Sequence, residues 1–134
     1  MPKVTCSWFH YKDDAPELLH MWLHLDRLGP VRFHTLDHIL DLQIDEPHGP
    51  YDMDEYGYVT IGDAPESFPL SRFVGQEVVA VHHIRQLSLD TRIGVRLEFQ
   101  AESVRILAIG DELVVISGLL PERMEADVTI EGPP

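Results

Sequence analysis

The chain has 134 residues and a formal net charge of −13, from 23 Asp and Glu against 10 Lys and Arg. This length fits one domain with its own core, and an acidic surface of this strength repels nucleic-acid phosphates and anionic membranes. The single cysteine, Cys6, excludes an internal disulfide, and the first residues lack the apolar stretch of a secretory signal. We therefore expect one cytoplasmic domain over residues 1–134, with a frayed tail at 132–134.

The first predicted elements are a strand and a helix. Residues 4–11 are rich in β-formers and aromatics and are typical of a strand. Asp13, Asp14 and Pro16 then have the composition of a helix start, and Gly29-Pro30 that of a helix end. Apolar residues recur between them at helical spacing, at Leu18, Met21, Trp22, Leu25 and Leu28. We predict an amphipathic helix over about 15–28, with His20, His24 and Arg27 on its polar face.

Strand periodicity follows and continues to the C-terminus. Polarity alternates over 36–45, and further strands are predicted at 56–61, 77–85, 93–99, 104–109, 113–117 and 126–130. Proline-containing loops separate the first of these, and Gly110-Asp111-Glu112 forms a turn. The sequence thus predicts an α+β domain: an antiparallel β-meander or curved sheet of about six to seven strands with one N-terminal helix. An exposed edge of this sheet would allow a homodimer.

The negative charge is concentrated between Phe33 and Ser71. This window contains no Lys or Arg and nine carboxylates: Asp37, Asp41, Asp45, Glu46, Asp52, Asp54, Glu55, Asp63 and Glu66. Three tyrosines are interleaved with them, and tyrosine is enriched at protein interfaces, although strand propensity also explains tyrosines here. We predict an acidic face for a basic protein partner, formed by Asp45, Glu46, Tyr51, Asp52, Asp54, Glu55, Tyr56, Tyr58 and Asp63.

Part of this acidic segment has a calcium-loop pattern. From Asp52 to Asp63, Asp stands at the first, third and twelfth positions and Gly at the sixth. Tyr56 replaces the oxygen ligand at the fifth position, and prolines on both sides exclude the two flanking helices, so this is not an EF-hand. A looser calcium site at Asp52, Asp54 and Asp63 and a solvated acidic loop both stay open.

The eight histidines are the second unusual feature. Six of them recur at intervals of ten and four residues: His10, His20, His24, His34, His38 and His48. In the predicted helix, His20 and His24 lie one turn apart and could share a divalent metal ion; the alternative is a solvent-facing pair without metal. His82 and His83 point to opposite faces of a predicted strand, and proton transfer by either would need a carboxylate partner.

Motifs of common enzymes are missing. The sequence has no Gly-x-Ser-x-Gly elbow, Walker loop or Gly-x-Gly-x-x-Gly motif. Cys6 and His10 would lie about 13 Å apart on an extended strand, so we expect Cys6 to be a packed residue. The sequence favours a non-enzymatic protein with no cofactor beyond a surface metal ion. A metal-dependent or acid–base enzyme using His20, His24 or the loop 52–63, and a small-ligand module, are the alternatives.

Three segments of the second half carry a resemblance. They are Phe-Val-Gly-Gln-Glu-Val at 73–78, Gly-Val-Arg-Leu-Glu-Phe at 94–99 and Ile-Leu-Ala-Ile-Gly-Asp-Glu-Leu at 106–113. Together they resemble small, mostly uncharacterised bacterial β-rich proteins, some of them immunity-like partners of secreted toxins. The resemblance implies a small non-enzymatic domain that binds another protein, in its sharpest form an immunity-type inhibitor of a basic protein. It carries over no catalytic residues.

Overall fold

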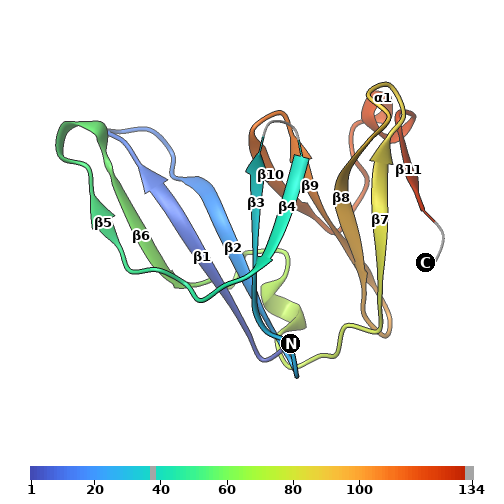
Figure 1. Cartoon of the computed structure of the whole chain (residues 1–134), viewed down its shortest axis with the longest axis horizontal. Coiled ribbons are helices and arrows are strands. Elements are labelled where there is room, and N and C mark those ends of the chain that lie inside the picture. The colour runs from blue at the N-terminus through green and yellow to red at the C-terminus, as the bar shows by residue number, and fades with distance from the viewer. Residues whose placement is uncertain (37–38, 132–134) are drawn as a thin grey trace.

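The computed structural model describes residues 1–36 and 39–131, which form two antiparallel sheets (Figure 1). The first sheet has the order β4-β3-β2-β1-β6-β5, and the second β10-β9-β8-β7-β11. The strands of the first are β1 (Lys3–His10), β2 (Glu17–Leu25), β3 (Gly29–Leu36), β4 (Ile39–Ile44), β5 (Tyr51–Asp52) and β6 (Tyr58–Asp63). Those of the second are β7 (Ala80–Gln86), β8 (Thr91–Glu98), β9 (Ser103–Ile109), β10 (Glu112–Ile116) and β11 (Val128–Ile130).

Helical structure is limited to three short segments of the described residues. These are the 3-10 turns η1 (Asp54–Tyr56) and η2 (Ser71–Phe73) and the single-turn helix α1 (Glu122–Glu125). None of them is long and apolar enough to cross a membrane. The α+β prediction, with its amphipathic helix, is therefore wrong, and the fold is almost entirely β.

The segment predicted as a helix over 15–28 contains β2 and the turn into β3. Its apolar residues do not alternate because β2 is covered on both faces: Met21, Trp22 and Leu23 are all 0% exposed. A strand buried on both sides cannot be distinguished from a buried helix by periodicity alone. The expected helix end is instead a hairpin turn, in which Arg27 (φ 72°) and Gly29 (φ 88°) have left-handed backbone conformations.

The strands predicted after this point fit the structure better. The segments 104–109 and 113–117 correspond to β9 and β10, joined at Gly110 with φ 63°. The single strand predicted over 36–45 is split, because β3 ends at Leu36 and β4 begins at Ile39. Asp37, His38 and the tail predicted to fray at 132–134 lie outside the described residues.

One hydrophobic core lies between the two sheets. The first sheet contributes Val4, Cys6, Met21, Leu23, Val31 and Phe33, and the second Val95, Leu97, Val104 and Ile106. The connection between the sheets adds Phe73, whose ring stacks on Phe99 with centroids 4.3 Å apart. Cys6 is fully buried, and burial raises the pKa of its thiol to about 12, so it is an unreactive packed residue.

A second, smaller cluster lies on the outer face of the second sheet. Ile84, Ile93 and Leu107 are covered there by Leu120, from the segment that precedes α1. Gly94 of β8 makes room for this packing, because Leu107 lies directly opposite it in the sheet. A Cβ atom at Gly94 would lie 2.3 Å from the backbone oxygen of Ile106 and 2.7 Å from Cδ2 of Leu107.

We expect Gly94→Ala to lower the free energy of unfolding by about 1–3 kcal/mol, the usual cost of overpacking a core. The clash is with backbone, which cannot rotate away. Urea denaturation measures the effect. Gly62→Ala in β6 is the matched control, because nothing lies within 4 Å of a Cβ atom there. Equal losses in the two variants would contradict this account of Gly94.

Candidate functional site

The connection between β4 and β5 crosses the first sheet from one edge to the other (Figure 1). We call its six residues, 45–50, the strap. At one end, the backbone nitrogen of Asp45 donates to the carbonyl of Pro30 at 3.1 Å, and its carboxylate accepts a 2.8 Å hydrogen bond from Arg32. At the other end, Tyr51 pairs with Val59 in the sheet. The strap thus covers the face of the first sheet that is turned away from the second.

Three histidines meet beneath and on the strap, and we call them the histidine cluster: His20 of β2, His34 of β3 and His48 of the strap. The ring centroids of His20 and His34 are 5.4 Å apart, and those of His20 and His48 are 5.6 Å apart. The indole ring of Trp22 lies 5.3 Å from His48 and 5.7 Å from His20. The fully buried Trp22 therefore supports the cluster from one side.

Each imidazole of the histidine cluster has one nitrogen beside a polar group. Nδ1 of His20 is 3.4 Å from Oγ of Ser7, and Nδ1 of His48 is 3.0 Å from the carbonyl oxygen of Gly49. Nε2 of His34 is 3.3 Å from the carboxylate of Asp41. The other nitrogen of His34, Nδ1, is buried and has no hydrogen-bond partner in the described part of the chain. The cluster is thus oriented by a hydroxyl, a carbonyl and a carboxylate, one for each ring.

The surroundings keep His20 neutral at neutral pH. Burial, and then the proximity of His34, His48 and Arg32, lower the pKa of His20 from 6.5 to about 4. His24, two strand positions beyond Trp22, also has a lowered pKa, mainly through burial, and its Nε2 is 2.9 Å from Oγ1 of Thr5. At neutral pH the ring nitrogens of His20 can therefore accept as well as donate.

His20 and His34 also form part of the wall of a cleft of about 990 Å³. The cleft lies where the start of β2 and the end of β3 face the turn between β9 and β10, and it is held there by a 2.8 Å hydrogen bond from Thr35 to the carbonyl of Asp111. Its apolar lining comes from Trp8, Ala15, Pro16, Leu18, Leu19, Ile109 and Leu113. Its carboxylates are Asp14, Glu17, Asp111 and Glu112, and none of the described residues that line it is Lys or Arg.

The residues predicted to form one acidic face lie in three places. Tyr51, Asp52, Asp54, Glu55, Tyr56 and Tyr58 belong to the hairpin of β5, η1 and β6 at the outer end of the first sheet (Figure 1). Asp45 and Glu46 belong to the strap. Asp63 lies at the opposite end of β6 from Tyr58, roughly 16 Å along the strand, with its carboxylate 3.7 Å from Nζ of Lys3. This separation also parts Asp63 from Asp52 and Asp54, the other members of the predicted calcium site.

The predicted metal pair His20 and His24 lies on a strand, where four residues span about 13 Å. The predicted helix, in which the rings of His20 and His24 would lie one turn apart, does not form. The neighbours of His20 are His34 and His48 instead. Over residues 1–36 and 39–131, no three His, Cys, Asp or Glu side chains already have the geometry to hold a metal ion.

The other predicted residues have local partners. His82 is half-buried with Nε2 3.5 Å from the carboxylate of Glu98, whereas His83 is exposed. His10 stacks on Tyr58, with ring centroids 4.7 Å apart, and its Nε2 is 2.8 Å from Oγ1 of Thr60. None of these three histidines is among the described residues that line the cleft.

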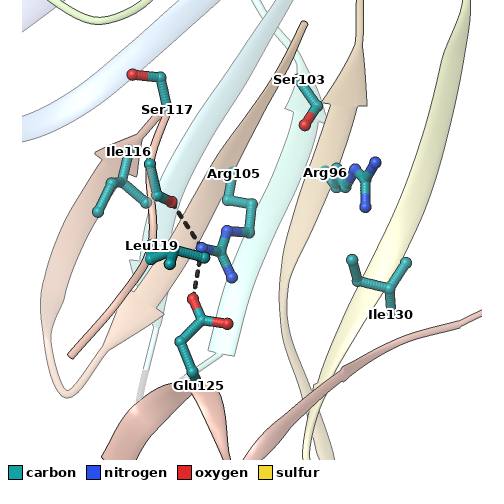
Figure 2. Close-up of a pocket in the computed structure, with 9 residues that line it drawn as sticks. Arg96, Ser103, Arg105, Ile116, Ser117, Leu119, Glu125 and Ile130 are labelled. Atoms are coloured by element: carbon teal, nitrogen blue, oxygen red, sulfur yellow. Dashed lines mark hydrogen bonds and ion pairs between the residues drawn. The ribbon is translucent and has the colours of Figure 1, made fainter. Parts of the chain in front are cut away.

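A second pocket, of about 450 Å³, lies on the outer face of the second sheet and contains two arginines (Figure 2). Arg105 donates to the carboxylate of Glu125 at 2.5 Å and to the carbonyl of Gly118 at 2.6 Å. Arg96 pairs with Glu98 at 3.0 Å. Because carboxylates already neutralise both guanidinium groups, this pocket mainly fastens the C-terminal segment to the sheet.

No known family model matches the chain, and no curated protein or solved structure shows detectable similarity to it.

The histidine cluster and the cleft were both missed from the sequence. The equal spacing of His20, His34 and His48 was the available signal. This spacing becomes informative only if residues 17–25 form a strand. His20 and His34 are then equally far from a hairpin turn centred on Arg27, so they lie side by side on the paired strands.

The lowered pKa of His20 makes the protein less stable in acid. Between pH 6.5 and about pH 4 the unfolded chain binds a proton at His20 that the folded chain does not, so stability falls as the pH falls through this window. The nearby groups whose positive charge disfavours protonation of His20 are His34, His48 and Arg32. We expect the melting temperature of His20→Gln to fall less between pH 7 and pH 4.5 than that of the unsubstituted protein.

The exposed His83→Gln serves as the control and should keep the original pH dependence. If the melting temperatures of His20→Gln and the unsubstituted protein fall equally between pH 7 and pH 4.5, His20 does not cause the acid sensitivity.

Proposed function

We propose that the protein is a small cytoplasmic binding domain whose acidic cleft receives a cationic side chain of a basic protein partner. The observation that carries this proposal is the composition of the cleft: four carboxylates among its described lining residues, which include no compensating Lys or Arg. An immunity-type inhibitor of a basic protein is the form that the resemblance of the segments 73–78, 94–99 and 106–113 suggests.

The carboxylates stand on two sides of the cleft. Asp14 and Glu17 come from the start of β2, and Asp111 and Glu112 come from the turn between β9 and β10. A guanidinium or ammonium group between them would be able to form charge-assisted hydrogen bonds to either side. The half-buried indole of Trp8 supplies aromatic and apolar surface for the aliphatic part of an Arg or Lys side chain.

The net charge of −13 acts over a longer range than these contacts. A negative potential accelerates the encounter with a basic partner and is screened by salt. The carboxylates Asp52, Asp54 and Glu55 at the outer hairpin contribute to this field without lining the cleft. In this proposal, the acidic segment attracts the partner and the cleft binds it.

A small organic cation is the second candidate ligand. The volume of the cleft, about 990 Å³, is at the upper end of the range for small-molecule sites and exceeds one amino-acid side chain. Comparing a capped arginine with an arginine-containing peptide distinguishes the two. A peptide that binds no more tightly than the single capped residue would favour the small cation.

We expect an arginine-containing basic peptide to shift the NMR signals of the Trp8 indole and of Leu18 in the protein. The double variant Asp111→Lys/Glu112→Lys should weaken this binding at least tenfold, because it places two positive charges beside the site. Glu55→Lys/Glu66→Lys is the matched control, since it changes the net charge equally at two exposed residues outside the cleft. If both variants weaken binding equally, only the overall charge matters and the cleft is not the site.

A further inference from the structure

The spacing of the rings in the histidine cluster is close to that of imidazoles that share a metal ion. A histidine nitrogen binds Zn²⁺ at about 2.0–2.1 Å, so two rings on one tetrahedral ion have centroids roughly 5 Å apart. The observed separations are 5.4 Å for His20 and His34 and 5.6 Å for His20 and His48. His20 is thus at a suitable distance from both other rings, and the third pair, His34 and His48, must approach each other when the ion binds.

The polar partners of the three rings also match those of metal ligands. A metal-binding histidine usually donates its second ring N–H to a carboxylate, a carbonyl or another polar group, which fixes the ring and exposes the lone pair of the first nitrogen. Here Asp41 lies beside Nε2 of His34, the carbonyl of Gly49 beside Nδ1 of His48, and Oγ of Ser7 beside Nδ1 of His20. The nitrogens left for a metal are then Nδ1 of His34 and Nε2 of His48 and His20.

One of these nitrogens lacks a partner among residues 1–36 and 39–131. Nδ1 of His34 is buried and makes no hydrogen bond to any of them, an arrangement that costs free energy because the atom has lost its water. A bond from this lone pair to a metal ion would satisfy it.

From these observations we propose that His20, His34 and His48 together bind one divalent transition-metal ion, with Zn²⁺ as the best fit to three imidazoles. Because the rings are not yet at bonding geometry, their side chains must rotate inward on binding. Three imidazoles on a tetrahedral ion leave a fourth coordination position for water or a ligand. This proposal does not depend on the proposed function, since the ion binds without a protein partner.

The test uses untagged protein stripped with a chelator and titrated with Zn²⁺ by calorimetry and with Co²⁺ by visible absorption. We expect one ion per chain, the ligand-field absorption of tetrahedral Co²⁺, and a higher melting temperature with Zn²⁺. His48→Gln should weaken Zn²⁺ binding at least tenfold. His48 lies outside the strands but packs on Trp22, so the melting temperature of the metal-free variant is measured first, and only a variant that melts cooperatively near the unsubstituted protein is titrated.

His24→Gln and His83→Gln are the controls and should bind Zn²⁺ as the unsubstituted protein does. His24 lies on the same strand as His20, and His83 is an exposed residue of the other sheet. The proposal is overturned if no ion binds in a one-to-one ratio, or if His48→Gln binds as tightly as the controls. It is also overturned if His24→Gln loses the ion, because the metal would then lie elsewhere on β2.

Discussion

The burial of β2 on both faces is the constraint on which the rest of the structure depends. On one side, Met21 and Leu23 join the core between the sheets. On the other, Trp22 is completely removed from solvent although the second sheet does not reach it. The strap provides this cover, and its His48 packs directly on the indole ring. Since a buried tryptophan typically contributes about 3–5 kcal/mol to stability, the strap is a necessary part of the fold.

The same arrangement creates the chemistry of this face. A strap that must cross Trp22 places His48 beside His20, and the register of β2 with β3 places His34 on the other side. Arg32 fastens the strap through Asp45 and also contributes to the lowered pKa of His20. Structural anchoring and the electrostatic state of the histidine cluster therefore depend on the same few side chains.

The two sheets differ in how their charges are compensated. In the second sheet, Arg96 and Arg105 pair with Glu98 and Glu125, and Arg85 and Arg92 share Glu131. The Arg96–Glu98 pair lies within β8, and the other three pairs hold the C-terminal segment against β7, β8 and β9. The described residues that line the cleft include no such arginines, so its carboxylates keep their negative potential. This difference is why the cleft, and not the pocket of Figure 2, is the better binding site for a cation.

The sequence predicts the strands best where a short apolar run is bounded by turn residues. Residues 104–109, which are followed by Gly110-Asp111-Glu112, belong to this class, and β9 forms there. The strand prediction fails at 17–25. This strand is covered on both faces, so its apolar and polar residues do not alternate. The cleft is beyond local reasoning altogether: Glu17 and Glu112 are brought together only by the packing of one sheet on the other. The position of His48 likewise depends on a connection that crosses the sheet, which no local pattern encodes.

The crossing connection also has almost no spare length. β4 and β5 are five strand spacings apart, roughly 24 Å at about 4.8 Å each. From Ile44 to Tyr51 the chain takes seven residue steps, which reach roughly 23–25 Å when fully extended. Pro47 and Pro50 suit this extended state, because each restricts itself and the residue before it to extended backbone. The width of the sheet therefore favours an extended strap, which carries His48 across the sheet to Trp22.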